Sequence, residues 1–291
     1  MSGSITLENR FGVNKMELIS LKYAIFVIVL LVLYYCFPKK YRWYVLLAGS
    51  MAYYVIICKW YVLFIIFTIC TTYGSTIWID KLLKKQNAIV KSHKEDWDRQ
   101  TRKDYKEKGR KKRVAVMLFA LLCNFGILAF LKYIPYAGEL GLLLPLGISF
   151  YTFQSMGYVM DVYREIVEPE KNFLKVALFV SFFPQIIQGP IAIYDKLAGQ
   201  LYEGHSLRLE NLQKGALLVL WGVMKKLVIA DRAVNIINFV MDKPMDFSGT
   251  YVFFAAVVYA LQLYADFSGG IDIVRGIAEM FGITMSTNFN H

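Results

Sequence analysis

Polar and helix-breaking residues stand inside, or at the ends of, long apolar stretches in the second half of the sequence, and they are the residues that could do chemistry. Amide, carboxylate and hydroxyl groups in such surroundings are costly to leave unpaired, so they mark candidate functional sites. The residues in this setting are Gln154, Gln185, Gln188, Pro190, Gln262, Asp266 and Ser268. They could form the polar wall of a passage through the protein. A purely structural role is the competing interpretation for each of them.

Two prolines divide the apolar stretch Val176–Tyr194. Pro184 and Pro190 each lack a backbone N–H, so a helix that runs through them loses hydrogen bonds. Freed backbone groups at membrane depth are tolerated only where they are buried in protein or line a cavity. The sequence therefore predicts that this stretch is broken or re-entrant rather than a plain span.

Asp266 is an isolated carboxylate that directly follows the uncharged stretch Phe247–Ala265. Its functional interpretation is an ionisable group at membrane depth. The structural interpretation is that Asp266 or Ser268 caps a short helix over Ile271–Phe281, after a chain turn at Gly269–Gly270. The sequence favours the cap, because paired glycines are typical of a turn.

Two adjacent lysines, Lys225 and Lys226, split another apolar stretch. Snorkelling of their side chains toward the membrane surface is one explanation. Pairing with Asp231, or with a phosphate group of a ligand, is the other. Farther along, Asp272 and Arg275 lie three positions apart and are expected to pair on one face of a helix.

The composition is that of a chain whose solvent is mostly lipid. Hydrophobic residues make up 57% of its 291 residues and charged residues 19%, whereas soluble proteins are about 45–50% apolar. This composition excludes a disordered chain, a nucleic-acid module with a small core and a disulfide-stapled secreted domain. No nucleic-acid partner is expected, because the net charge of +11 is explained by membrane topology.

Eight apolar stretches could each supply a membrane-embedded helix, which needs roughly 20 residues to cross a ~30 Å hydrocarbon core. They are 18–38, Trp43–Cys58, Trp60–Ile79, Val114–Leu131, Leu140–Met160, Val176–Tyr194, 215–224 with a weaker continuation, and Phe247–Ala265. Aromatic residues crowd the ends of these stretches, as they do at membrane interfaces. The sequence thus predicts an all-α, polytopic integral membrane protein with about eight membrane-embedded helical segments.

The Lys and Arg residues predict the orientation and the organisation of the chain. Segment 80–113 carries 14 Lys and Arg against six Asp and Glu, so a net +8 lies in one loop. The positive-inside rule places that loop in the cytosol. The chain then divides into a polar N-terminal segment (1–17, where Met16 is a second candidate start), three transmembrane helices (18–79), the basic cytosolic loop (80–113) and a core (114–291).

The basic loop is expected to form one or two surface helices. Its charge suits contact with the anionic headgroups of the lipid bilayer. It would equally suit the docking of an acidic cytosolic partner, such as a carrier protein.

The four cysteines, Cys36, Cys58, Cys70 and Cys123, all lie in apolar stretches. They are expected to be free, buried thiols. They have no CxxC spacing and no neighbouring histidines, so no metal site is predicted.

Four blocks of residues follow one another in the second half of the chain. They are Pro145–Gln154 running on to Asp161–Arg164, Phe182–Gln185 with Gln188–Pro190, Lys225–Lys226 with Ile229–Asp231, and Gln262–Gly270 followed by Asn288–Asn290. In this order they resemble the membrane-bound O-acyltransferase (MBOAT) family. The most similar branch is the bacterial one that includes the alginate O-acetyltransferase membrane subunit and the D-alanyl-lipoteichoic acid transferase. The resemblance covers roughly residues 140–290.

The resemblance implies a helical bundle around a tunnel through the bacterial cytoplasmic (inner) membrane. It implies transfer of an acyl group, acetyl or D-alanyl, from a cytosolic thioester donor to hydroxyls of a cell-envelope polysaccharide or teichoic acid. The donor would be an acyl-CoA or an acyl-carrier protein, and no bound cofactor is implied. The candidate residues named above would line the tunnel, and an extracytoplasmic acyltransferase is an implied partner.

The chemistry of the family centres on histidine, and the three histidines of this chain do not match its motif. His93 lies in the basic loop, His205 in a polar link, and His291 directly after Asn290. The chain therefore looks C-terminally truncated, and no residue in it is assigned a catalytic role. Residues 1–291 alone are expected to be inactive, because an attacking hydroxyl needs a base with a pKa near the operating pH.

Two other functions stay open on the sequence. One is a membrane transporter or channel that uses Asp266, and the other is a non-catalytic membrane scaffold that recruits a partner through the basic loop. The lack of an internal repeat counts against the transporter.

Overall fold

The computed structural model describes residues 18–93, 95–133 and 144–287, which are 82% helical and contain no strand. These residues divide into two compact units, which are described separately below. The first unit comprises Leu47–Phe183 and Ile191–Tyr202, and the second comprises 18–46, Pro184–Pro190 and 203–287. The predicted all-α class is confirmed.

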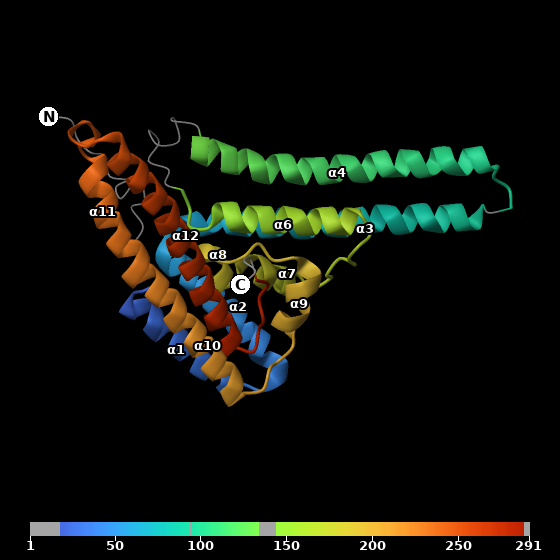
Figure 1. Cartoon of the computed structure of the whole chain (residues 1–291). Coiled ribbons are helices and arrows are strands. Elements are labelled where there is room, and N and C mark those ends of the chain that lie inside the picture. Colours follow the sequence, from blue (N-terminus) through green and yellow to red (C-terminus); the bar gives the residue numbers. More distant parts are fainter. Residues whose placement is uncertain (1–17, 94, 134–143, 288–291) are drawn as a thin grey trace. The chain divides into compact units, whose positions relative to one another are not determined.

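The first unit is built on three long helices that lie side by side (Figure 1). They are α3 (Val62–Ser92), α4 (Arg99–Tyr133) and α6 (Ile148–Tyr163), and each contacts the other two. The short helices α7 (Phe173–Ser181) and α9 (Tyr194–Tyr202) pack on each other, and α7 also packs on α3. The buried face of α3 carries Thr and Ser residues, whose small side chains let neighbouring helices approach closely.

The basic segment 80–113 forms a helical hairpin, in which α3 continues to Ser92 and α4 begins at Arg99. The Trp97 ring lies between His93 and Tyr105, with ring centroids 4.9 and 5.0 Å away. Along the hairpin, the Gln86 amide donates to the Lys106 carbonyl (3.3 Å). The expected surface helices are therefore extensions of two long apolar helices.

The second unit is dominated by two long helical rods that run against each other (Figure 1). One rod comprises α10 (Leu209–Met224), a π-helical segment (Lys225–Ala230) and α11 (Asp231–Met241) without interruption, and the other is α12 (Gly249–Met280). The unit also contains α1 (Leu21–Cys36), the start of α2 (Arg42–Cys58) and most of the short helix α8 (Phe183–Gln188). The side chain of Ser20 caps α1 by accepting from the Tyr23 N–H.

A turn that contains Lys39, Lys40 and Arg42 ties one end of the second unit together. The Arg42 guanidinium donates to the carbonyls of Phe37 (2.9 Å), Tyr35 (3.1 Å) and His205. The Tyr35 hydroxyl donates to the carbonyl of Met280 (2.7 Å), the last residue of α12. A cluster of basic and aromatic groups of this kind is typical of a membrane–water interface.

The surface of the helices confirms a multi-pass membrane protein. Three helical stretches are long and apolar enough to cross a bilayer, namely Lys39–Ser92, Arg99–Tyr133 and Gly249–Met280. Two shorter apolar stretches, Leu21–Cys36 and Phe173–Gln188, accompany them. Large apolar side chains such as Leu122 and Phe253 are about seven-tenths exposed on the protein surface, as residues that face lipid are.

Two predictions from the sequence are wrong. There is no chain turn at Gly269–Gly270 and no separate helix over Ile271–Phe281, because α12 runs unbroken through both. Neither Asp266 nor Ser268 therefore caps a helix. The cysteines are all free, but only Cys58 is buried, whereas Cys36 and Cys70 are exposed on helices with lipid-facing surfaces.

Candidate functional site

The predicted break in the stretch Val176–Tyr194 is confirmed, and polar side chains satisfy the backbone groups that it frees. In an unbroken helix the Phe183 N–H would donate to the Phe179 carbonyl, four residues earlier. Here α7 ends at Ser181, and the two groups are separated. The Gln154 amide donates to the Phe179 carbonyl (2.8 Å), and the Phe183 N–H donates to the Ser50 hydroxyl (3.1 Å). Both side chains are buried, so Gln154 holds irregular backbone in the first unit.

In the second unit, Gln185 does the same for the end of α8. Its amide donates to the carbonyl of Pro190 (2.8 Å), while its own carbonyl accepts from the Gly189 N–H (3.0 Å). The side chain is 2% exposed, and its Oε1 atom has no partner among the described residues. The motif from Gln185 to Pro190 is therefore a rigid, buried turn with one acceptor left over.

The neighbouring Gln188 lies against α12 at Gly270. A Cβ atom on Gly270 would collide with Gln188 Oε1, so the Gln188 carboxamide occupies the space that a side chain would take there. This contact joins the second and fourth motif blocks, which are some eighty residues apart in the sequence.

Glycines also set the contact between α10 and α12. Gly215 and Gly222 lie seven residues apart on α10, and Gly269 and Gly276 lie seven apart on α12. They meet as antiparallel pairs, since a Cβ on Gly222 would lie 2.5 Å from the Gly269 carbonyl oxygen, and one on Gly215 2.5 Å from that of Gly276. Glycines at such a spacing let two helix backbones touch.

The close approach of the helices brings a buried ion pair together. Lys225 Nζ lies 2.7 Å from Asp272 Oδ2, and the two side chains are only 9% and 5% exposed. Arg275 Nη1 lies 3.5 Å from the other oxygen of Asp272, as the sequence predicted. Lys225 also sits over the ring of Trp221, 5.6 Å from its centroid. Two cations thus share one buried carboxylate.

The second lysine of the block reaches a different carboxylate on α12, because Lys226 Nζ is hydrogen-bonded to Asp266. This pair is less buried, with side chains 27% and 34% exposed. The alternative explanation, that the lysines pair with Asp231, is therefore wrong. The π-helical segment, which starts at Lys225, explains the outcome, because it changes the rotation per residue and lets two adjacent side chains reach one neighbouring helix.

The structure brings most of the predicted site residues into one unit. Gln185, Gln188, Pro190, Gln262, Asp266 and Ser268 lie in the second unit, and Gln154 lies in the first. Ser268 is 1% exposed, and its hydroxyl has no partner among the described residues. Gln262 is partly exposed and forms no contact that defines a role. That these residues line a tunnel stays a prediction.

The sequence predicts the pairing of Asp272 with Arg275 but not the contact of Lys225 with the same carboxylate. The matching seven-residue glycine spacings on 215–222 and 269–276 were the available signal. They indicate that the two segments pack together, and Lys225 and Asp272 each follow by three residues a glycine of the pair Gly222 and Gly269.

The chemistry that the described residues offer is charge and hydrogen bonding. Within 18–93, 95–133 and 144–287, no group of three or more His, Cys, Asp or Glu side chains is placed to hold a metal ion. His93 stacks on Trp97 in the hairpin, and His205 is held by its backbone next to Tyr34 and Arg42. His291 lies outside the described residues.

Comparison with known proteins finds curated relatives of part of the chain. No family model matches the chain. A peptidoglycan O-acetyltransferase of Helicobacter pylori is 32% identical over 60% of this chain and 40% of its own length. The probable alginate O-acetylase AlgI of Pseudomonas aeruginosa is 34% identical over 51% of this chain and 28% of its own length. A teichoic acid D-alanyltransferase of Bacillus subtilis is 25% identical over 50% of this chain and 37% of its own length.

The chain spans less than half the length of these curated relatives, all of which are membrane-bound O-acyltransferases. Their names include both of the activities that the motif blocks suggested, O-acetylation and D-alanyl transfer. Over the part of the sequence that they share, the chain is therefore a homologue of the membrane-bound O-acyltransferases, and the resemblance drawn from its motif blocks is confirmed.

Proposed function

We propose that the full-length protein is an integral-membrane O-acyltransferase of a bacterial cytoplasmic membrane. It moves an acetyl or D-alanyl group from a cytosolic thioester donor, an acyl-CoA or an acyl-carrier protein, to hydroxyls of a cell-envelope polymer. The observation that carries the proposal is the similarity to relatives named for O-acetylation of peptidoglycan and alginate and for D-alanylation of teichoic acid.

The polar and charged side chains that are buried in the second unit support this proposal. Three motif blocks, around Gln185–Pro190, Lys225–Lys226 and Gln262–Gly270, lie in this unit, and the first two each contact α12. The unit thus holds buried polar atoms and a buried ion pair among apolar helices. Ser268 and Gln185 each keep a buried polar atom without a partner among the described residues. Such atoms are suited to bind the polar part of a substrate that enters the membrane.

The partners follow from the same proposal. The basic hairpin 80–113 would receive the donor or its acidic carrier protein on the cytosolic side. An extracytoplasmic acyltransferase would complete the transfer to the polymer. Lys226 neutralises the carboxylate of Asp266, which gives Asp266 less affinity for a transported cation.

The test is a gain of polymer-bound ester in cells. The full-length protein is expressed in a bacterial strain that lacks its own envelope O-acyltransferase, and ester-linked acetate and D-alanine are released by mild base and quantified. Acyl ester on a polymer fraction, dependent on the protein, is the expected result. Membranes that contain the folded protein but give no ester from either donor class would overturn the proposal.

The same assay tests whether residues 1–291 suffice. The histidines of this segment are His93, His205 and His291, none of which lies inside an apolar stretch. A histidine base at membrane depth is therefore missing from this segment, and residues 1–291 alone are expected to show no transfer above background. Transfer by this segment at a rate comparable to the full-length protein would contradict the expectation.

A further inference from the structure

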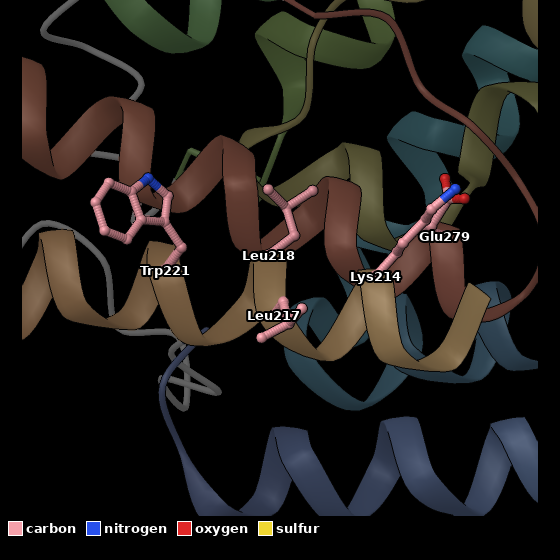
Figure 2. Close-up of a pocket in the computed structure, with 5 residues that line it drawn as sticks. All are labelled: Lys214, Leu217, Leu218, Trp221 and Glu279. Atoms are coloured by element: carbon pink, nitrogen blue, oxygen red, sulfur yellow. The ribbon is translucent and has the colours of Figure 1, made fainter. Parts of the chain in front are cut away.

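A groove lies between α10 and α12, next to the buried ion pair of Lys225 and Asp272. Trp221, which contacts Lys225, also lines the groove. The volume of the groove is about 460 Å³, and its lining residues are Lys214, Leu217, Leu218, Trp221 and Glu279. Figure 2 shows Lys214 and Glu279 together at one end, Trp221 at the other end, and the two leucines between them. A volume of this size is within the range of small-molecule sites.

The groove has a charged end and an apolar end. Its charged end lies at the start of α10 and the end of α12, where Tyr35 next to the basic turn holds the Met280 carbonyl. From Lys214 to Trp221 the helix rises roughly 10 Å. A membrane surface at the basic and aromatic turn puts the charged end at headgroup level and the apolar end at the depth of acyl chains. This is the order of groups in a membrane lipid.

The charges at the mouth of the groove are of both signs. Lys214 Nζ is paired with Glu210 Oε1 at 2.8 Å on the same helix. Glu279 supplies a second carboxylate, which the Thr284 hydroxyl holds through a hydrogen bond of 3.1 Å. One ammonium and two carboxylates attract a headgroup that carries its own ammonium beside its phosphate. A purely anionic headgroup would meet excess negative charge there.

We propose that this groove binds one phospholipid with a zwitterionic, primary-ammonium headgroup. Its phosphate lies at Lys214, its ammonium donates to the carboxylate of Glu279, and one acyl chain packs along Leu217, Leu218 and Trp221. This lipid site does not depend on the acyl-transfer function proposed above, so the two proposals are tested separately.

The test is native mass spectrometry of the full-length protein in detergent. The delipidated protein is offered equal amounts of phosphatidylethanolamine, phosphatidylcholine and phosphatidylglycerol with the same acyl chains. The expected result is one retained phosphatidylethanolamine, favoured roughly fivefold or more over each of the others, which is the effect of one hydrogen bond to a charged group. Phosphatidylcholine is the decisive comparison, because it is zwitterionic but has no N–H donor.

Two variants locate the lipid. Glu279→Gln should abolish the preference for phosphatidylethanolamine over phosphatidylcholine, and Leu217→Trp should fill the groove and remove the retained lipid. Leu220→Trp is the matched control, since Leu220 is equally exposed on α10 but does not line the groove. If Leu217→Trp does not fold, the exposed double variant Lys214→Gln/Glu279→Gln makes the same test. Equal retention of the ethanolamine and choline lipids by the unmodified protein, stronger retention of phosphatidylglycerol, or equal loss in the Leu220→Trp control would overturn the proposal.

Discussion

At the scale of single residues, the buried charges of the second unit have the greatest energetic consequence. Lys225 and Asp272 are almost fully buried and in direct contact, and Arg275 shares the same carboxylate. A buried pair adds little net stability, because desolvation offsets the attraction, but removal of one partner leaves a charge in a medium that cannot solvate it. The neighbouring pair of Lys226 and Asp266 is partly exposed and is worth much less.

Lys225→Met is therefore expected to destabilise the full-length protein strongly, by about 3 kcal/mol. Lys226→Met, the matched control on the next residue, is expected to cost about 1 kcal/mol or less. Thermal unfolding in detergent measures both. The double variant Lys225→Met/Asp272→Leu should recover part of the loss, since it removes the buried pair and leaves only Arg275, which is more exposed than Lys225. Equal effects of the two lysine variants would show that loss of Lys225 does not leave a costly buried charge on Asp272.

Gln154 makes a second test at this scale, because its amide is the group that satisfies the freed Phe179 carbonyl. Gln154→Leu leaves that buried carbonyl without a donor, at a cost of about 1–3 kcal/mol. Gln100→Leu is the control, since Gln100 is exposed and its side-chain amide donates to the exposed Asp104. Unfolding temperatures of the two variants should differ clearly. An unchanged unfolding temperature for Gln154→Leu would mean that the break in the helix does not depend on this side chain.

At the scale of elements, the contact between α10 and α12 decides where the motif residues meet. Two antiparallel glycine pairs bring the backbones together, and the π-helical segment then turns both lysines toward α12. A break at Phe182 separately leaves α8 free to form the buried turn of Gln185–Pro190. The site is thus made of irregularities, a π segment, a broken helix and glycine contacts, on otherwise regular helices.

Gly269→Ala tests this arrangement directly. The added Cβ would lie 2.8 Å from the carbonyl oxygen of Gly222, a backbone atom that cannot move aside as a flexible side chain could. The expected cost is about 1–3 kcal/mol, together with loss of acyl transfer, because the ion pairs are pushed apart. Gly74→Ala on α3 is the control, since no atom lies within 4 Å of its new Cβ. The two variants are compared by thermal unfolding and by the polymer-ester assay, and wild-type behaviour of Gly269→Ala would refute the close packing.

At the scale of the whole molecule, the basic hairpin predicts how the chain is oriented. Its helices extend well beyond the apolar stretches that end at Ile79 and begin again at Val114, so the charge of segment 80–113 lies outside the bilayer. Moving that net charge of +8 across a membrane is unfavourable, so the positive-inside rule predicts that the hairpin lies in the cytosol.

Lys103→Cys, at an exposed position of the hairpin, should accordingly be labelled by a membrane-impermeant maleimide only when the cytosolic face is accessible. The experiment uses the full-length protein with its native cysteines replaced by serine, and compares intact spheroplasts with inside-out vesicles. Labelling in intact spheroplasts would reverse the orientation, and with it the proposed entry side of the acyl donor.

The sequence by itself determined the class of the protein, because hydrophobic stretches of membrane length and the clustering of Lys and Arg depend only on local composition. It also determined the broken stretch at Pro184 and Pro190, since proline acts on its own backbone, and the pairing of Asp272 with Arg275, which needs only helical spacing. These properties are decided within a few residues of one another.

The tertiary structure alone decided which distant residues meet. Gly269–Gly270 looked like a turn because paired glycines usually break a chain, but packing against α10 makes the absence of a side chain an advantage inside α12. For Lys225 and Lys226 the sequence offered snorkelling or pairing with Asp231 in their own segment, yet they pair with Asp272 and Asp266 on a neighbouring helix. The physical reason is that a helix–helix contact depends on two surfaces at once, so the partner of a charge or a glycine is known only when both helices are in place.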